Sequence, residues 1–142
     1  MYKKRFYMLY DYCQQNNIKV GFVNNKEDFC YPKLNMIFIS ERSNWKYKLF
    51  ALMHEIGHIK IYQNRESWEK DFTCFSVDVT DGRKKRSIGY QVSLIAEEID
   101  AWRVGKQIAL SCGVSFDNEE YNKYSDSCIF SYIRNANSSV NN

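Results

Sequence analysis

Histidine and proline are scarce in this chain of 142 residues, which has two histidines and one proline. Long apolar runs are missing too, because no stretch approaches the ~20 consecutive apolar residues that a membrane-spanning helix needs. The opening MYKKRFYMLYDYCQQ lacks the apolar core and the small-residue cleavage site of a signal peptide. We therefore expect a cytoplasmic protein without a membrane segment.

Paired cysteines are also missing. The five cysteines are odd in number and none belongs to a C-x-x-C pair, which argues against a disulfide scaffold. The net charge of +3 is small, and the lysines and arginines are spread along the chain rather than gathered in one stripe. We expect reduced thiols and no direct contact with nucleic acid.

The length suits one compact domain and is too short for two. We expect this domain to cover residues 1–135, followed by a disordered polar tail at 136–142. Apolar residues at helical or alternating spacing indicate an α+β fold that is mainly helical with a short β-sheet. Ser43 or Asn44 is the expected N-cap of the second helix. The expected elements are helices at 3–16, 45–62, 88–113 and 118–134, strands at 18–23 and 35–40, and a long loop at 64–87 with a short strand near 72–79.

Both histidines lie in one short segment, FALMHEIGHIKIY, at residues 50–62. His54 and His58 are four residues apart, so on a helix they lie on one face, one turn apart. Two imidazoles in this position can bind one ion, and Zn²⁺ takes nitrogen ligands at ~2.0–2.1 Å. Glu55 projects about 100° around the helix, where it can accept a proton from a water bound to the ion. The segment therefore predicts a zinc site at His54 and His58, with Glu55 as the general base.

The same five-residue motif occurs by chance in unrelated proteins, so its surroundings matter. Apolar residues flank it on two sides of the helix, and polar groups on a buried helix need partners. An ion would supply those partners; the alternative is a pair of histidines satisfied by hydrogen bonds within the core. Phe50, Gly57 and Ile61 share the histidine face, and Leu49, Leu52, Ile56 and Ile59 line the opposite one.

A catalytic zinc site has three protein ligands and one open position. Since there is no third histidine, the missing ligand must be a carboxylate or a thiolate, which excludes the three-histidine arrangement of the metzincins. In AEEIDAW, at residues 96–102, Glu98 lies at the centre of an apolar helix stripe, where a carboxylate is costly unless it is paired or binds a metal. We expect Glu98 to be the third ligand, and a buried salt bridge is the competing interpretation. Glu97, at the edge of the stripe, is the alternative ligand, and Cys74 and Cys112 are more distant alternatives.

The order of elements and two motifs resemble the ImmA/IrrE-type zinc metallopeptidases. A short N-terminal helix, a strand ending NMIFIS, a helix with LFALMHEIGH and a later helix with EEIDAW carry the resemblance over roughly residues 5 to 112. Its specific residues are His54, Glu55, Gly57, His58 and the segment Glu98–Trp102. It implies a small zincin-like domain with an HExxH active-site helix, Zn²⁺ bound by His54, His58 and Glu98, and Glu55 as the catalytic base.

The resemblance further implies an endopeptidase that cleaves a repressor or another regulatory protein of a phage or mobile element, often one that carries a helix-turn-helix. SprT-like proteases are a poorer match, because they generally have a third histidine. The alternative function, from another class, is a zincin-fold protein that binds a partner without turnover, such as a phage- or element-encoded inhibitor of a host defence system. The many Tyr and Phe residues suit such a contact surface. For the peptidase, Tyr90, Tyr121 and Tyr124 are candidate stabilisers of the oxyanion by residue type alone.

Overall fold

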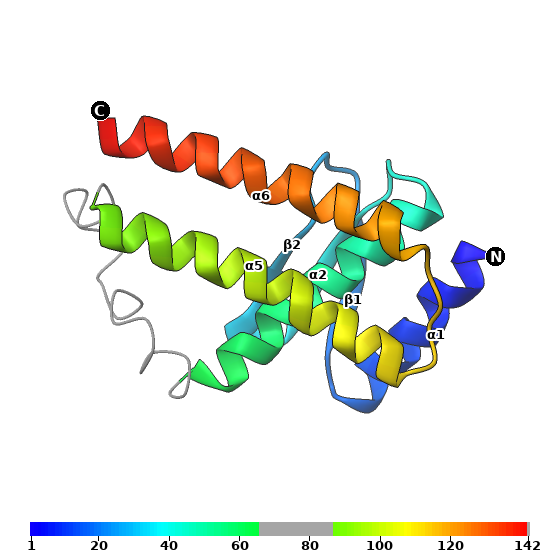
Figure 1. The fold of residues 1–142 in the computed structure, drawn as a ribbon. Helices are drawn as coiled ribbons and strands as arrows, with labels where there is room; N and C mark the ends of the chain where they lie inside the picture. Colours follow the sequence, from blue (N-terminus) through cyan, green and yellow to red (C-terminus); the bar gives the residue numbers. More distant parts are fainter. Residues whose placement is uncertain (66–86, 142) are drawn as a thin grey trace.

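A computed structural model describes residues 1–65 and 87–141 (Figure 1). Within these residues it has four α-helices, one 3₁₀ helix and one sheet of three strands. The fold is therefore mainly helical with a small sheet, as the sequence predicts. In chain order the elements are α1 (Tyr2–Gln15), β1 (Lys19–Val23), β2 (Phe29–Tyr31), η1 (Pro32–Leu34), β3 (Met36–Ser40), α2 (Trp45–Gln63), α5 (Ile88–Ser111) and α6 (Asn118–Asn141).

The sheet has the strand order β1-β3-β2, with β3 in the centre. β1 runs parallel to β3, with Val20 opposite Ile37, so the two predicted strands do lie in one sheet. β2 pairs antiparallel with β3 on its other side. The sequence pattern does not predict β2, because three residues before Pro32 are too few to show an alternating pattern. β2 is an edge strand, and it lies next to α2.

α2 is the central helix of the fold. It contacts α1 and the sheet on one side and α5 on the other. The side chain of Asn44 caps it by accepting a hydrogen bond from the backbone nitrogen of Tyr47 at 3.0 Å. Leu49, Leu52 and Ile56 are fully buried, since a helix that is apolar on opposite sides can be enclosed by neighbours on both. The predicted motif helix is thus present and buried.

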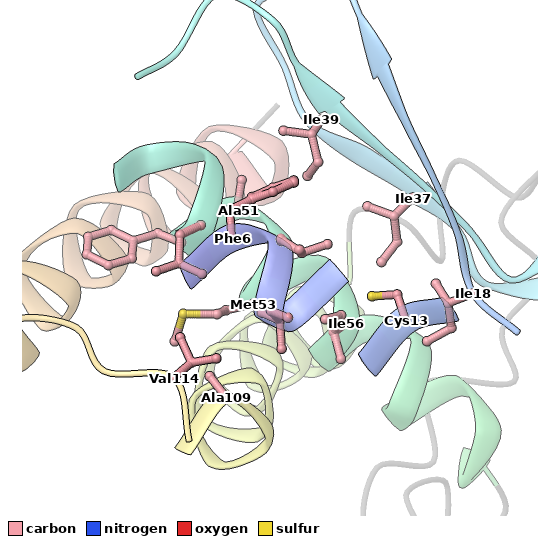
Figure 2. Packing of buried hydrophobic residues seen from close by; sticks show 14 of the residues in the cluster. Phe6, Cys13, Ile18, Ile37, Ile39, Ala51, Met53, Ile56, Ala109 and Val114 are labelled. Atoms are coloured by element: carbon pink, nitrogen blue, oxygen red, sulfur yellow. The ribbon is translucent and has the colours of Figure 1, made fainter. Parts of the chain in front are cut away.

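The buried side chains of α1 follow the predicted helical spacing, with Phe6, Leu9 and Cys13 fully buried. They belong to one hydrophobic cluster with Ile37 and Ile39 of β3 and the apolar residues of α2 (Figure 2). Such interiors are packed as densely as organic crystals. The cluster therefore holds α2 in a defined position relative to the sheet.

α5 and α6 run side by side in opposite directions (Figure 1). The side chain of Ser87 caps α5 by accepting a hydrogen bond from the backbone nitrogen of Tyr90, so this helix begins where the sequence predicts. α6 is longer than predicted: it continues past Arg134 to Asn141, through the residues expected to form a polar tail. Ala136 is buried there, so packing extends the helix through a segment whose Asn and Ser residues are weak helix formers.

Most of the predicted loop at 64–87, with its short strand near 72–79, lies outside the described residues, and so does Cys74. In the described part of the chain, no helix combines the length and the apolar character needed to cross a membrane.

Candidate metal centre

α2 and α5 cross in direct backbone contact, and a glycine on each helix permits it. A Cβ added at Gly57 would lie 1.9 Å from the carbonyl oxygen of Ala101, and one at Gly105 would lie 1.9 Å from that of Met53. Any side chain at either position would force the helices apart, because Cβ contacts essentially never fall below 3.0 Å. The crossing therefore places α5 against the histidine-bearing part of α2.

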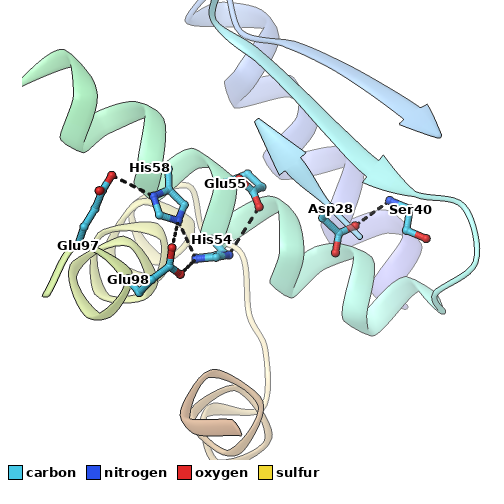
Figure 3. A network of polar contacts seen from close by, with 7 residues as sticks. All are labelled: Asp28, Ser40, His54, Glu55, His58, Glu97 and Glu98. Atoms are coloured by element: carbon cyan, nitrogen blue, oxygen red, sulfur yellow. Dashed lines mark hydrogen bonds and ion pairs between the residues drawn. The ribbon is translucent and has the colours of Figure 1, made fainter. Parts of the chain in front are cut away.

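His54, His58 and Glu98 converge at this crossing (Figure 3). The Nε2 atom of His54 lies 2.8 Å from Oε2 of Glu98, and the Nε2 atom of His58 lies 3.0 Å from Oε1 of Glu98. The two Nε2 atoms are 3.0 Å apart. One ligand atom from each residue lies within 4.8 Å of the other two, so the group could hold a metal ion. The structure thus brings together the three residues expected to be ligands.

The separations within this group suit a small tetrahedral ion. With bonds of ~2.0–2.2 Å, tetrahedral zinc sets its ligand atoms about 3.3–3.6 Å apart. The two Nε2 atoms are 3.0 Å apart, and each lies 2.8 or 3.0 Å from a different oxygen of Glu98, so each of these pairs would open by about half an ångström around such an ion. Two imidazoles and one carboxylate are also a donor set of catalytic zinc sites. The residues present fit Zn²⁺.

Each histidine has a carboxylate on its other ring nitrogen. Oε1 of Glu97 lies 3.3 Å from Nδ1 of His58, and Oε1 of Glu55 lies 3.7 Å from Nδ1 of His54 (Figure 3). The His54 ring also stacks on Trp102, with centroids 4.1 Å apart and planes 6° apart. Such outer partners orient a histidine and favour the tautomer whose Nε2 faces the ion. Glu97, the alternative ligand, therefore lies behind His58 and supports it.

The protonation of the group reflects the balance between burial and these contacts. Burial lowers the pKa of His58, but its hydrogen bonds with Glu97 and Glu98 and the nearby carboxylate charges outweigh burial and raise that pKa to about 10. Burial raises the pKa of Glu98, but its hydrogen bonds with His54 and His58 outweigh burial and lower that pKa to about 2. At neutral pH a protonated His58 therefore faces an ionised Glu98. A divalent cation would displace that proton as the partner of the carboxylate.

Glu55 is buried between α2 and the edge strand β2. Cys30 on β2 lines the side pocket with it, and burial together with the charge of Glu55 raises the pKa of the Cys30 thiol. Asp28, just before β2, accepts a hydrogen bond from the backbone nitrogen of Ser40 at 2.7 Å (Figure 3). Burial raises the pKa of Asp28; the bond from Ser40 opposes this rise and the charge of Glu55 adds to it. The expected base is thus held on the sheet side of the ligand group.

Two hollows open at this group. The first, which we call the cleft, has a volume of about 550 Å³ and lies between α2, α6 and the segment 26–28. The second, the side pocket, has a volume of about 240 Å³ and lies between α2 and β2. Asp28, His54, Glu55 and Tyr132 line both hollows. A bound molecule that spans their junction would therefore pass next to the base and one expected ligand.

Two residues of α6 at this site, Cys128 and Tyr132, are absent from the sequence prediction. Cys128 and Tyr132 line the cleft from α6. Burial and the charges of Glu98 and Glu55 raise the pKa of the Tyr132 hydroxyl. Tyrosine and cysteine spaced i, i+4 on an amphipathic helix are typical of ordinary packing, so the chain offers no local signal for either residue.

Of the three tyrosines considered by residue type, Tyr124 lines the cleft. The hydroxyl of Tyr121 donates to the backbone oxygen of Trp102 at 2.5 Å. Tyr124 lies on α6 and does not line the side pocket. Tyr90, in the first turn of α5, is not among the described residues that line either hollow.

Cys112, the other distant alternative as third ligand, is the C-cap of α5. It is not part of the His54, His58 and Glu98 group that the described residues form. The carboxylate of Glu98 completes that group instead.

Comparison of the chain with models of protein families, with curated proteins and with solved structures gives no match.

Proposed function

We propose that this protein is a zinc-dependent endopeptidase of the ImmA/IrrE type, built on a small zincin-like domain. The observation that carries the proposal is the convergence of His54, His58 and Glu98, with Glu55 beside them, where a cleft and a side pocket meet. The sequence resemblance points to the same four residues, three as ligands and one as base. Residues 44 positions apart in the chain, His54 and Glu98, meet in the arrangement that this chemistry requires.

His54, His58 and Glu98 would hold Zn²⁺, whose Lewis acidity allows a water molecule to lose a proton near neutral pH. Glu55 accepts that proton while the water oxygen forms a bond to the carbon of the peptide carbonyl. It then returns the proton to the leaving nitrogen as the carbon–nitrogen bond breaks, so the protons balance over the cycle. Glu55 is buried and lines both hollows together with His54, which places its carboxylate beside the path of a substrate.

The shape of the site supports an extended peptide as substrate. β2 lies at the edge of the described sheet, so the backbone groups on its outer side can pair with an added strand. The side pocket adjoins β2, and the cleft continues from it past Glu55. A peptide bound along β2 would cross the junction of the two hollows and bring a peptide bond next to the base.

For the biological substrate we favour a regulatory protein of a phage or mobile element, such as a repressor with a helix-turn-helix, cleaved in the cytoplasm. The support for this choice is the sequence resemblance. In this scheme the protein acts on another protein and needs no contact with nucleic acid or membrane.

The substitution Glu55→Gln tests the proposal, because it keeps the size of the side chain and removes its capacity to accept a proton. The wild type should bind zinc stoichiometrically and cleave a helix-turn-helix repressor encoded beside its own gene, with products identified by mass spectrometry after co-expression. Glu55→Gln should retain zinc and lose cleavage by about 10²–10⁴-fold. Glu119→Gln, exposed on α6, is the matched control and should cleave like the wild type. Unchanged cleavage by Glu55→Gln, or a wild type without affinity for zinc, would overturn the proposal.

A second function, binding a partner without turnover, is favoured by exposed apolar side chains on α5 and α6. These are Ile88, Val92, Ile99, Phe130 and Ile133. Exposed apolar surface of this kind often marks a site of protein–protein contact, as an inhibitor of a host defence system would need. The same variant separates the two functions: a biological effect that survives Glu55→Gln with zinc retained is due to binding.

A further inference from the structure

Tyr132 lies where the cleft and the side pocket meet, since it lines both. It comes from α6, and burial together with the charges of Glu98 and Glu55 raises the pKa of its hydroxyl, so the hydroxyl lies near the ligand group. The residue is nevertheless 42% exposed. The side chain therefore borders the space through which a substrate would pass.

Hydrolysis of a peptide at this site needs a hydrogen-bond donor for the negative charge that develops on the carbonyl oxygen. A donor already in place stabilises this charge strongly, and the loss of one typically costs about 10²–10³-fold in rate. Lys26 and Arg134 line only the cleft and are exposed, and the hydroxyl of Tyr121 donates to the backbone oxygen of Trp102. Among the described tyrosines, Tyr124 lines only the cleft, whereas Tyr132 lines both hollows.

We propose that Tyr132 is a further catalytic residue, whose hydroxyl donates a hydrogen bond to the carbonyl oxygen of the scissile peptide. This inference rests on the proposed peptidase function and extends it to α6. In the step concerned, the water oxygen bonds to the carbonyl carbon, the electron pair of the C=O double bond moves to the oxygen, and Glu55 takes the proton. The hydrogen of Tyr132 stays on its own oxygen throughout. The charge of Glu98 acts on this hydroxyl, so the hydroxyl lies close to an anionic group beside the histidines.

Acetohydroxamic acid, added to the zinc-loaded protein, tests this role without knowledge of the substrate. Its hydroxamate group binds zinc and presents a carbonyl oxygen that carries part of the anion's negative charge, as the oxygen of a peptide carbonyl does when water attacks. Tyr132→Phe removes the hydroxyl and keeps the ring. Tyr124→Phe is the matched control, since it removes a hydroxyl from the same helix and the same cleft at a residue that does not line the side pocket. Zinc affinity is measured first by competition with a chelator, and the hydroxamate dissociation constant follows by calorimetry.

Both variants should bind zinc as the wild type does. Tyr132→Phe should bind acetohydroxamate about 10- to 100-fold more weakly, as expected for the loss of one hydrogen bond to a charged group, and Tyr124→Phe should bind it normally. Once a peptide substrate is known, Tyr132→Phe should lower kcat and leave KM nearly unchanged.

Equal hydroxamate affinity in Tyr132→Phe and the wild type would overturn the role of Tyr132 and leave the peptidase proposal standing. A fall in zinc affinity in Tyr132→Phe would also overturn it, because the hydroxyl would then support the ligands instead. A wild type that binds neither zinc nor hydroxamate would overturn the peptidase proposal, and the role of Tyr132 with it.

Discussion

Replacing Gly57 by alanine should push α2 and α5 apart and weaken the metal site. The new Cβ would lie 1.9 Å from the carbonyl oxygen of Ala101 and needs at least 3.0 Å, so the helices must separate by about 1.1 Å at this point. Overpacking of this kind costs about 1–3 kcal/mol. Helix propensity alone has the opposite sign, because alanine is favoured over glycine by about 1 kcal/mol in a helix. The sign of the stability change therefore shows which effect dominates.

The same displacement acts on the ligands. Glu98 lies one turn before Ala101 on α5, and zinc tolerates little change from its ~2.0–2.2 Å bonds. We expect Gly57→Ala to lower zinc affinity by about a hundredfold or more, judged against the 10–100-fold cost of losing only an outer partner. Zinc affinity is measured by competition with a chelator, and the stability of the metal-free protein by urea unfolding followed by circular dichroism.

Gly21→Ala is the control for a glycine-to-alanine change away from the crossing. A Cβ at Gly21, on β1, would meet only the ring of Phe38 at 3.3 Å, which leaves α2 and α5 in place. This variant should bind zinc like the wild type. If Gly57→Ala is more stable than the wild type and binds zinc equally well, the reasoning that glycine sets the crossing is refuted.

Two further predictions concern the same group. Because the pKa of His58 is raised to about 10 without an ion, this histidine is protonated at pH 7 and must lose its proton to bind zinc. Zinc binding should therefore release about one proton, and the affinity for zinc should rise about tenfold per pH unit up to pH 10. Calorimetry in buffers of different ionisation enthalpy measures the released proton. A heat of zinc binding that does not depend on the buffer would contradict this prediction. Glu97→Gln should lower zinc affinity about 10–100-fold, because it weakens the contact between residue 97 and the ring of His58. The control is Asp100→Asn, on the same helix and paired with Arg103, which should leave zinc affinity unchanged. Equal zinc affinities in the two variants would contradict the supporting role of Glu97.

Local spacing was sufficient to predict the part of the site that α2 carries. The positions of His54 and His58 on one helix face depend only on helical geometry, which holds whatever surrounds the helix. Glu98 was predictable for a different reason, since a carboxylate in the middle of an apolar stripe requires a partner. Its partners turned out to be these two histidines.

The rest of the site depends on contacts between distant segments, which local patterns do not encode. Cys30 reaches Glu55 only because a three-residue edge strand pairs with β3, and Tyr132 reaches Glu98 only because α6 folds back along α5. The glycines did carry a usable signal: Gly57 lies inside a strongly apolar helix, where glycine costs about 1 kcal/mol and so indicates a close approach of another backbone.

The ligands come from two segments separated in the chain, and His54 and Glu98 are 44 positions apart. The unfolded chain has no such three-ligand site, so zinc would bind the folded form much more tightly and shift the folding equilibrium by mass action. At a free zinc concentration 100 times the dissociation constant, this adds at most about 2.7 kcal/mol to the free energy of unfolding, against the ~5–15 kcal/mol typical of a whole domain. The small unfolded fraction, which proteases remove in a cell, would then shrink as the supply of zinc rises, even for a variant that cannot cut a peptide.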